Sequence, residues 1–194
     1  MPIRIPAAWR LVLKEIQLQG FPEAAIVGGA LRDLVHGVPV KDVDIFVTDS
    51  PKLREALGVV FPQGYKTVLH PNSCDYIDSL ADVTSVYEGV RHGVEFQIIA
   101  VRDQASVEDF VARIDFGICR IGYDGSAAYH PESFIRDVQN KTFTLLRSDD
   151  AAQFNRSLER YDRLQAKYPK HTLVVQPEFE HLLPATIDLV PLSA

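Results

Sequence analysis

The strongest constraint on the fold of this chain lies in residues 26–47. Gly28 and Gly29 follow a short apolar run and precede a helical pattern that stops at the next glycine. Asp42 and Asp44 then open a second apolar run. Apolar runs bounded by glycine predict strands, and the helical pattern between them predicts a short helix. We therefore expect a strand, a glycine turn, a helix, and a second strand that begins with two carboxylates.

The spacing of the two aspartates indicates a shared chemical role. Side chains in a strand alternate between faces, so Asp42 and Asp44 should project from the same side. Two neighbouring carboxylates repel each other and need a positive counter-charge. A divalent cation suits them, and Mg²⁺ takes oxygen ligands and commonly shares its shell with substrate phosphates. The pattern predicts a metal site at the start of the second strand.

The paired glycines predict a phosphate site beside that metal site. A glycine turn that leads into a helix presents unpaired N–H groups and the positive end of the helix dipole. Arg32 can add a contact to phosphate, or it can form a salt bridge that orients Asp33. Lys41 can attract phosphate or remain solvated. Together, the phosphate turn and the carboxylate pair suit phosphoryl or nucleotidyl transfer.

These residues resemble a known signature. Gly28-Gly29-Ala30-Leu31-Arg32-Asp33, followed by Lys41-Asp42-Val43-Asp44, resembles the head domain of class II tRNA nucleotidyltransferases (CCA-adding enzymes) and bacterial poly(A) polymerases. That family belongs to the DNA polymerase β-type nucleotidyltransferase superfamily. The resemblance implies an α+β fold, a mixed β-sheet with helices packed on one face.

The resemblance also implies an activity and its ligands. The expected reaction is transfer of a nucleoside monophosphate from an NTP to an acceptor hydroxyl, with release of pyrophosphate and two Mg²⁺ ions. Asp42 and Asp44 are the expected catalytic metal ligands. The expected nucleotide-binding residues in this part of the chain are Gly28, Gly29, Arg32, Asp33 and Lys41.

Glu95 is a candidate for a third metal ligand. Residues 84–90 and 94–101 have the pattern of a hairpin, with a turn at residues 91–93. The superfamily often places a third carboxylate on a strand beside the aspartate pair, and Glu95 is the acidic residue on the returning strand. The alternative is a solvated residue on the open face of an antiparallel sheet.

A second, partial match to the family follows a helix expected at residues 107–113. Arg113-Ile114-Asp115-Phe116 resembles the Arg-Arg-Asp-Phe-Thr-x-Asn-Ala motif, which implies nucleotide contacts from Arg113 and Asp115. Ile114, Gly117 and Cys119 depart from that motif. The alternatives are an arginine favoured by the helix dipole and an aspartate in a tight turn. Residues 117–123 are expected to form a strand.

The remaining expectations concern the flanking segments. Trp9, Leu13 and Ile16 predict an amphipathic helix near the N-terminus. Ser50 and Pro51 predict the start of a helix that runs to about Leu57. Residues 58–83 are interpreted as loop with short strand pieces, for example at residues 67–69.

The chain is expected to divide into a nucleotidyltransferase head domain, residues 1–148, and an extension, residues 149–194. The extension should contain a helix that ends near Tyr168 and then an irregular tail. Its apolar stripe is expected to consist of Phe154, Leu158, Tyr161 and Leu164. In CCA-adding enzymes a helix at this place carries arginines that template the incoming base. Here Arg160 and Arg163 keep the spacing while Ser157 replaces a third, so we interpret the helix as a solvated amphipathic one.

Charge and composition limit the partners. The net charge is −6, whereas a protein that grips many phosphates is usually basic. No run approaches the roughly 18 apolar residues of a membrane span, and two cysteines make no disulfide framework. We expect no membrane contact and a cytoplasmic protein. The acceptor is expected to be an RNA end such as a tRNA 3′ terminus. A small molecule or a protein as acceptor, and a non-catalytic nucleotide-binding module, remain alternatives.

Overall fold

The structure is a computed structural model that describes residues 3–69, 82–103 and 106–183. The chain forms two compact units. Unit 1 comprises residues 1–112 and 122–129, and unit 2 comprises residues 113–121 and 130–194. Each unit therefore contains two separate stretches of chain.

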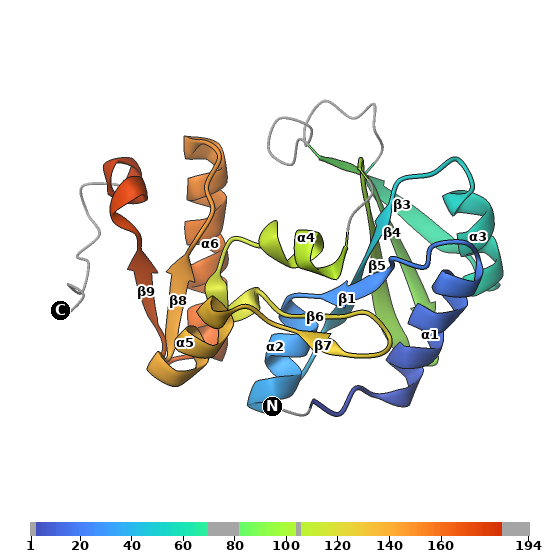
Figure 1. The fold of residues 1–194 in the computed structure, drawn as a ribbon, viewed down its shortest axis with the longest axis horizontal. Helices are drawn as coiled ribbons and strands as arrows, with labels where there is room; N and C mark the ends of the chain where they lie inside the picture. The colour runs from blue at the N-terminus through green and yellow to red at the C-terminus, as the bar shows by residue number, and fades with distance from the viewer. Residues whose placement is uncertain (1–2, 70–81, 104–105, 184–194) are drawn as a thin grey trace. The chain divides into compact units, whose positions relative to one another are not determined.

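Unit 1 is built on a mixed sheet, in the order β3-β4-β5-β2-β1-β6-β7 within the described residues (Figure 1). β2 and β5 are parallel, and the other neighbours are antiparallel. The expected α+β fold with a mixed sheet is confirmed. Its strands are β1 (Ala25–Val27), β2 (Asp42–Thr48), β3 (Tyr65–Leu69), β4 (Val83–Arg91), β5 (Val94–Val101), β6 (Gly122–Tyr123) and β7 (Ala128–Tyr129).

The helices of unit 1 are α1 (Ala7–Leu18), α2 (Gly29–His36), α3 (Leu53–Val60) and α4 (Val107–Ala112). They cover one face of this sheet, called here the closed face, and part of the other, where Phe110 of α4 packs on Phe46 of β2 with ring centroids 5.6 Å apart. The uncovered part of that second face, beside the start of β2, is called here the open face. The closed face carries fully buried side chains, among them Val43 and Ile45 of β2 and Phe96 of β5. Phe61, which directly follows α3, packs on this face, with its ring centroid 6.3 Å from that of Phe96. α1 contacts α3, and Figure 1 shows the two helices side by side.

The packing of Phe61 depends on a glycine in the sheet. A Cβ atom on Gly89 of β4 would come within 2.5 Å of the Phe61 ring. Ordinary van der Waals contact needs about 3.5–4.0 Å, so only glycine lets the ring reach the strand. This contact fixes the segment after α3 against the closed face.

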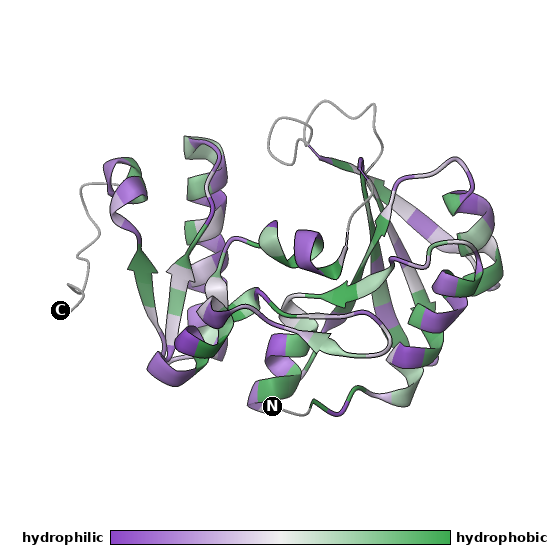
Figure 2. Cartoon of the chain, viewed as in Figure 1, coloured by the Kyte–Doolittle hydropathy of each residue, from purple (hydrophilic) through white to green (hydrophobic). Residues whose placement is uncertain are grey.

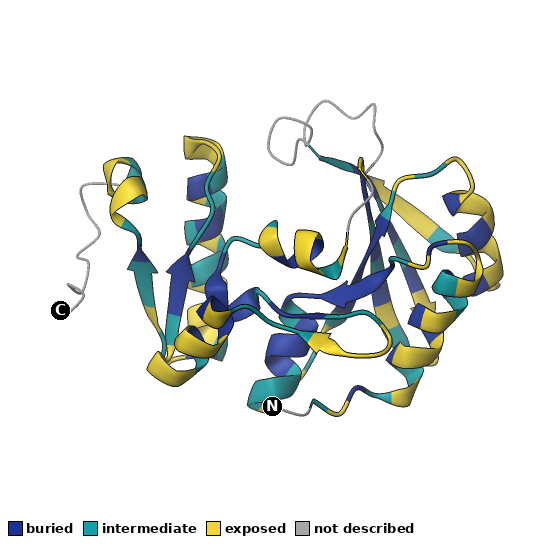
Figure 3. Cartoon of the chain, in the orientation of Figure 1, coloured by how far each residue is buried: buried dark blue, intermediate teal, exposed yellow. Residues whose placement is uncertain are grey.

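β1 lies inside the sheet and is short, apolar and buried. All three of its residues are buried, and Figures 2 and 3 show a hydrophobic strand without exposed positions. It pairs with β2 on one side and β6 on the other. In β7, at the edge of the sheet, Ala128 is exposed and Tyr129 is half-buried. The central position of β1 explains its continuous apolar sequence, because a strand buried on both faces does not alternate.

Unit 2 contains a second sheet of two parallel strands, β8 and β9. Parallel strands need a long crossover connection, and α6 provides it. The ring of Phe143 on β8 lies 5.7 Å from that of Phe116 and 5.8 Å from that of Tyr168. The elements are η2 (Gly117–Cys119), α5 (Glu132–Asn140), β8 (Thr142–Leu145), α6 (Ala151–Lys167), β9 (Thr172–Val175) and η3 (Pro177–Leu182).

Asp137 joins three parts of unit 2. Its fully buried carboxylate accepts hydrogen bonds from the Thr142 hydroxyl at 2.8 Å, and from the Thr144 N–H at 3.0 Å and hydroxyl at 2.5 Å. A Cβ atom on Gly117 would lie 2.6 Å from Asp137 Oδ2, so η2 can approach the Asp137 carboxylate only because residue 117 has no side chain. Asp137 therefore holds α5, β8 and η2 together.

Two expected boundaries are wrong. α3 begins at Leu53 and is preceded by Lys52, whereas Ser50 accepts a hydrogen bond from the Lys52 N–H at 3.3 Å in the turn before the helix. The strand expected at residues 117–123 is a 3₁₀ turn, η2, followed by the short β6. The close approach of Gly117 to Asp137 favours this turn over an extended strand.

The C-terminal extension also differs from expectation. Residues 172–175 form β9 instead of an irregular tail, and residues 184–194 of that tail lie outside the described residues. Ser157 is buried in α6 together with Phe154, while Leu158 is only half-buried.

Two further expectations are not tested by the structure. Residues 70–81 of the loop expected at 58–83 lie outside the described residues. The domain boundary after residue 148 stays a prediction.

In the described part of the chain, no helix is both long enough and apolar enough to cross a lipid bilayer.

Candidate active site

The two aspartates of β2 lie on the open face of the sheet. Asp42 and Asp44 are partly exposed, whereas the residues that alternate with them, Val43 and Ile45, are fully buried. The side chain of Asp42 is 30% exposed. Strand alternation therefore places both carboxylates on the same side, at the beginning of β2.

The glycine turn lies at the same end of the sheet. Ile26 of β1 pairs with Ile45 of the antiparallel β2, so the chain leaves β1 where β2 begins. Gly28 has φ 90° and ψ −130°, a conformation that is nearly restricted to glycine. The N–H of Arg32 donates to the Gly28 carbonyl at 3.1 Å, which closes the first turn of α2. The N–H groups before it have no carbonyl partner within the helix and can face a phosphate.

Arg32 and Asp33 form a buried ion pair beneath this turn. Nε and Nη2 of Arg32 donate to Asp33 Oδ1 at 2.8 and 2.6 Å, and both side chains are almost fully buried. A Cβ atom on Gly29 would lie 3.6 Å from Arg32 Nη2, so the guanidinium packs against the turn. Of the two roles open for Arg32, the salt bridge with Asp33 is present. Phosphate contact by Arg32 or Asp33 stays a prediction.

Lys41 and Glu95 flank Asp42. Lys41 Nζ lies 3.4 Å from Asp42 Oδ2, but the lysine side chain is 81% exposed, so the pair contributes little to stability. Glu95 of β5 lies opposite Asp42 in the parallel register and is exposed. Among the described residues, no three His, Cys, Asp or Glu side chains form a ready-made metal cluster. The role of Glu95 as a third ligand stays a prediction.

A pocket of about 590 Å³ extends from Asp42 across the neighbouring strands. Gln97 Nε2 on β5 donates to Glu88 Oε1 on β4 at 3.2 Å across its floor. Glu88 and Gln97 were not among the residues expected at the site, although the hairpin register pairs them and could have predicted them. The lining residues are Lys41, Asp42, Gln63, Gly64, Tyr65, Lys66, Glu88, Gly89, Val90, Glu95, Phe96 and Gln97.

Asp115 belongs to unit 2 and is bound to α6. Arg160 Nη1 donates to Asp115 Oδ1 at 2.7 Å, and the Ser157 hydroxyl donates to Oδ2 at 2.9 Å. The Phe116 N–H also donates to Oδ1, at 2.8 Å. Ser157, the residue expected to replace an arginine of CCA-adding enzymes, is therefore a hydrogen-bond donor to Asp115 of the partial motif. Sequence reasoning did not predict this contact, since it joins residues 42 positions apart.

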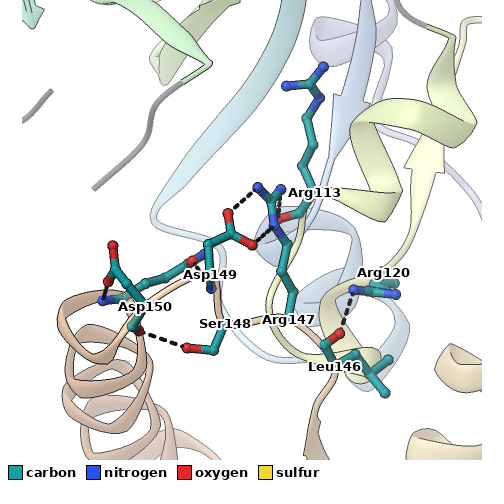
Figure 4. A network of polar contacts seen from close by, with 8 residues as sticks. Arg113, Arg120, Leu146, Arg147, Ser148, Asp149 and Asp150 are labelled. Carbon is teal, nitrogen blue, oxygen red and sulfur yellow. Dashed lines mark hydrogen bonds and ion pairs between the residues drawn. The ribbon is translucent and has the colours of Figure 1, made fainter. Parts of the chain in front are cut away.

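Arg113 is part of a network of arginines in unit 2 (Figure 4). Arg147 forms a two-pronged ion pair with Asp149 and donates from Nη1 to the Arg113 carbonyl at 3.4 Å. In Figure 4 the Arg113 guanidinium points away from this ion pair. Burial lowers the pKa of Arg113, and the charge of Arg147 lowers it further. Nη2 of Arg120 donates to the Leu146 carbonyl at 3.4 Å on the other side of the network.

The candidate residues thus fall into two groups. Unit 1 gathers one group at the end of the sheet where β2 begins: Gly28, Gly29, Arg32, Asp33, Lys41, Asp42, Asp44 and Glu95. Unit 2 holds Arg113 and Asp115, each within its own polar network. A nucleotide-binding role for Arg113 and Asp115 stays a prediction.

A family model described as "Gabija anti-defense 2 family protein" matches residues 8–141. The chain is also 28% identical over 185 residues to the CCA-adding enzyme of Enterococcus faecalis, a match that covers 89% of this chain. It spans 44% of the length of that enzyme.

Solved structures with similar folds include CCA-adding enzymes. The enzyme of Bacillus stearothermophilus in complex with CTP has a TM-score of 0.58 at 21% identity, covering 90% of this chain and 42% of that one. The enzyme of Thermotoga maritima complexed with tRNA has a TM-score of 0.59 at 19% identity. The match covers 92% of this chain and 42% of that enzyme's chain. These comparisons confirm the expected fold and the expected likeness to CCA-adding nucleotidyltransferases.

Proposed function

The chain belongs to the Gabija anti-defense 2 family, and we propose, from its carboxylate pair and its likeness to CCA-adding enzymes, that it is a magnesium-dependent nucleotidyltransferase. The reaction would transfer a nucleoside monophosphate from an NTP to an acceptor hydroxyl and release pyrophosphate. The observation that carries the proposal is the pair Asp42 and Asp44 on one face of β2, at the end of the sheet where the Gly28 turn lies. The sequence relationship to a CCA-adding enzyme supports the same chemistry.

The residues present fit a magnesium site. Asp42 and Asp44 supply two oxygen donors on one face, both reachable from solvent, and Mg²⁺ prefers oxygen ligands. Glu95 can add a third donor from the neighbouring strand. The bound ions would lower the pKa of the acceptor hydroxyl and neutralise charge on the phosphates. Keeping two carboxylates side by side has little structural benefit otherwise, since they repel each other.

The glycine turn and α2 would hold the triphosphate. The free N–H groups at the start of α2 and the helix dipole favour bound phosphate. The buried Arg32–Asp33 pair would keep the turn in place, because it packs directly beneath Gly29. Lys41, which is exposed beside Asp42, would add positive charge at the edge of the proposed nucleotide site.

An RNA end is the first candidate acceptor. Proteins of similar structure include a tRNA-processing enzyme and a CCA-adding enzyme complexed with tRNA. A net charge of −6 argues against contact with a long stretch of phosphates, so a short terminus such as a tRNA 3′ end fits better. Arg160 is one of two arginines on α6 that keep the spacing expected of CCA-adding enzymes, and it forms an ion pair with Asp115.

A protein hydroxyl is the second candidate acceptor. The family description names an action against Gabija, and transfer of a nucleotide onto a protein of the Gabija defence would provide such an action. The negative charge of the chain is compatible with a protein acceptor. This alternative uses the same carboxylates and the same NTP, and it differs only in the molecule that becomes labelled.

The test is label transfer from each α-³²P NTP, with Mg²⁺ or with EDTA. The acceptors offered would be tRNA without its 3′ end, total RNA, and purified Gabija proteins. We expect Mg²⁺-dependent label on one acceptor, and its loss in the Asp42→Asn/Asp44→Asn double variant. Asp49→Asn, an exposed aspartate just beyond the other end of β2, is the matched control and should keep full activity. No label on any acceptor with any NTP would overturn the proposal.

A further inference from the structure

α1 has an exposed apolar stripe in addition to its buried one. The buried stripe, Trp9, Val12, Leu13 and Ile16, faces the core. Leu11 and Leu18, seven residues apart and therefore on one side of the helix, are 53% and 70% exposed. A helix that only covers a sheet needs one apolar stripe, so the second one is left unexplained by the fold.

This exposed stripe borders a pocket of about 700 Å³ between α1 and the turn that joins β6 to β7. The floor of the pocket is fixed by Gln17, whose Nε2 donates to the Asp124 carbonyl at 2.7 Å and to the Ala24 carbonyl at 3.1 Å. A Cβ atom on Gly125 would lie 3.2 Å from the Gln17 amide, so the turn packs closely on it. All of these residues belong to unit 1, and the pocket is therefore built within one unit.

The pocket is cationic at its rim. Arg10 and Lys14, one helical turn apart on α1, are exposed and line it. The acidic residue in the lining is Asp124, and its Oδ1 already accepts hydrogen bonds from the Ser126 N–H, the Ser126 hydroxyl and the Ala127 N–H. The rim therefore presents positive charge beside leucine side chains, on a chain with a net charge of −6.

We propose that this pocket is a docking groove for an acidic, amphipathic segment of a partner protein. Glutamate or aspartate of the segment would pair with Arg10 and Lys14, and its apolar residues would cover Leu11 and Leu18. A nucleic acid would satisfy the charges but would leave the leucines exposed. A second copy of this chain would bring an equally cationic groove against the first, which disfavours self-association through this face.

The groove is separate from the proposed transfer site. α1 packs with α3, and α3 is followed by Phe61 on the closed face of the sheet, whereas Asp42 and Asp44 lie on the open face. A partner held at α1 would thus leave the metal and nucleotide residues accessible. Docking does not depend on the transfer reaction, and each can be tested without the other.

The test is fluorescence anisotropy with the full chain and a labelled helical peptide that carries leucines along one face and glutamates beside them. The matched peptide has lysine in place of each glutamate. We expect the acidic peptide to bind about tenfold or more tightly than the basic one, because like charges at the rim repel the latter. Equal binding of the two peptides, or binding of neither, would overturn the proposal.

Two double variants locate the binding. Arg10→Glu/Lys14→Glu should reverse the preference between the peptides, and Leu11→Ser/Leu18→Ser should weaken both by about tenfold or more. The control is Lys52→Glu/Val59→Ser at α3, where Val59 is 57% exposed, and it should bind as the unaltered chain does. Unchanged peptide binding in the α1 variants would overturn the assignment, as would a concentration-dependent dimer that only the leucine variant abolishes.

Discussion

Asp42 and Glu95 lie opposite each other on the neighbouring parallel strands β2 and β5. Neighbouring strands are about 4.8 Å apart, and residues in register project from the same face. The exposed carboxylate of Glu95 therefore lies on the same side of the sheet as that of Asp42. This register is the observation behind the proposal that Glu95 joins Asp42 and Asp44 as a third metal ligand.

The first prediction concerns the aspartate pair. Asp42→Asn or Asp44→Asn should lower NTP-dependent transfer by at least about 100-fold, because each removes a metal ligand. The free energy of unfolding should stay the same or rise, because replacing one carboxylate relieves the repulsion. Label transfer and urea unfolding, measured on the same preparations, check both parts. Full activity in either variant would exclude the proposed metal site.

The second prediction concerns Glu95. Glu95→Gln should raise the Mg²⁺ concentration needed for half-maximal transfer by about tenfold, because it removes a charged ligand opposite Asp42. A titration of Mg²⁺ at saturating NTP measures this. Glu55→Gln on α3, also an exposed glutamate, is the control and should leave the titration unchanged. An unaltered Mg²⁺ requirement in Glu95→Gln would make Glu95 a surface residue only.

The third prediction concerns the turn before α2. Gly28→Ala should lower the free energy of unfolding by about 1–3 kcal/mol, because the backbone there has φ 90° and ψ −130°. NTP binding should weaken as well, since the N–H groups of the turn would shift. Gly58→Ala in α3 is the matched control: nothing lies within 4 Å of its added Cβ atom, and it should be neutral or stabilising. Urea unfolding of both variants shows whether the backbone conformation at Gly28 requires a glycine. Equal stability of the two variants would contradict that requirement.

The fourth prediction concerns the centre of unit 2. Asp137→Ala should lower the free energy of unfolding by about 3 kcal/mol or more, because it leaves two buried donors of Thr144 and the half-buried hydroxyl of Thr142 without their acceptor. Asp162→Ala, an exposed carboxylate on α6, should change stability by less than about 0.5 kcal/mol. Thermal melts of the two variants provide the comparison. Equal melting temperatures would contradict the role assigned to Asp137.

The fifth prediction concerns the link between Asp115 and α6. Arg160→Met should lower the free energy of unfolding by about 1–2 kcal/mol, a modest value because the arginine side chain is 34% exposed and partly screened by solvent. Arg163→Met, three residues further along the same helix and exposed, should have no measurable effect. Urea unfolding measures the difference. If Arg160 instead contacts nucleotide only, its replacement will weaken NTP binding and leave stability unchanged.

Local patterns predicted most of unit 1. The alternation of Asp42 and Asp44 with buried Val43 and Ile45 is a property of one strand, and the hairpin register that places Glu95 follows from its short turn. Such features need only neighbouring residues. The parallel pairing of β2 with β5 could not be predicted from neighbouring residues, because it joins strands that are separated by more than forty residues.

Unit 2 was predicted less well because long-range contacts determine it. Residues 117–119 have a strand-like sequence, yet Gly117 packs against the buried Asp137 and the backbone turns. Ser157 has no local reason to be buried, and only its hydrogen bond to Asp115 explains its position. β9 forms because β8 offers it a parallel partner across α6. In each case a distant residue overrode the local preference.

The division of unit 1 into two separate stretches of chain also affects how the protein is made. β1 pairs with β6, and Gly122 leaves the ribosome about 95 residues after its partner Val27. At the usual pace of synthesis that interval lasts about 5–20 s. During this time one edge of an apolar strand has no partner and can pair with another nascent chain. Translation speed and chaperone supply should therefore affect the soluble yield, and a chain that stops before Gly122 should aggregate even though it contains every candidate metal ligand.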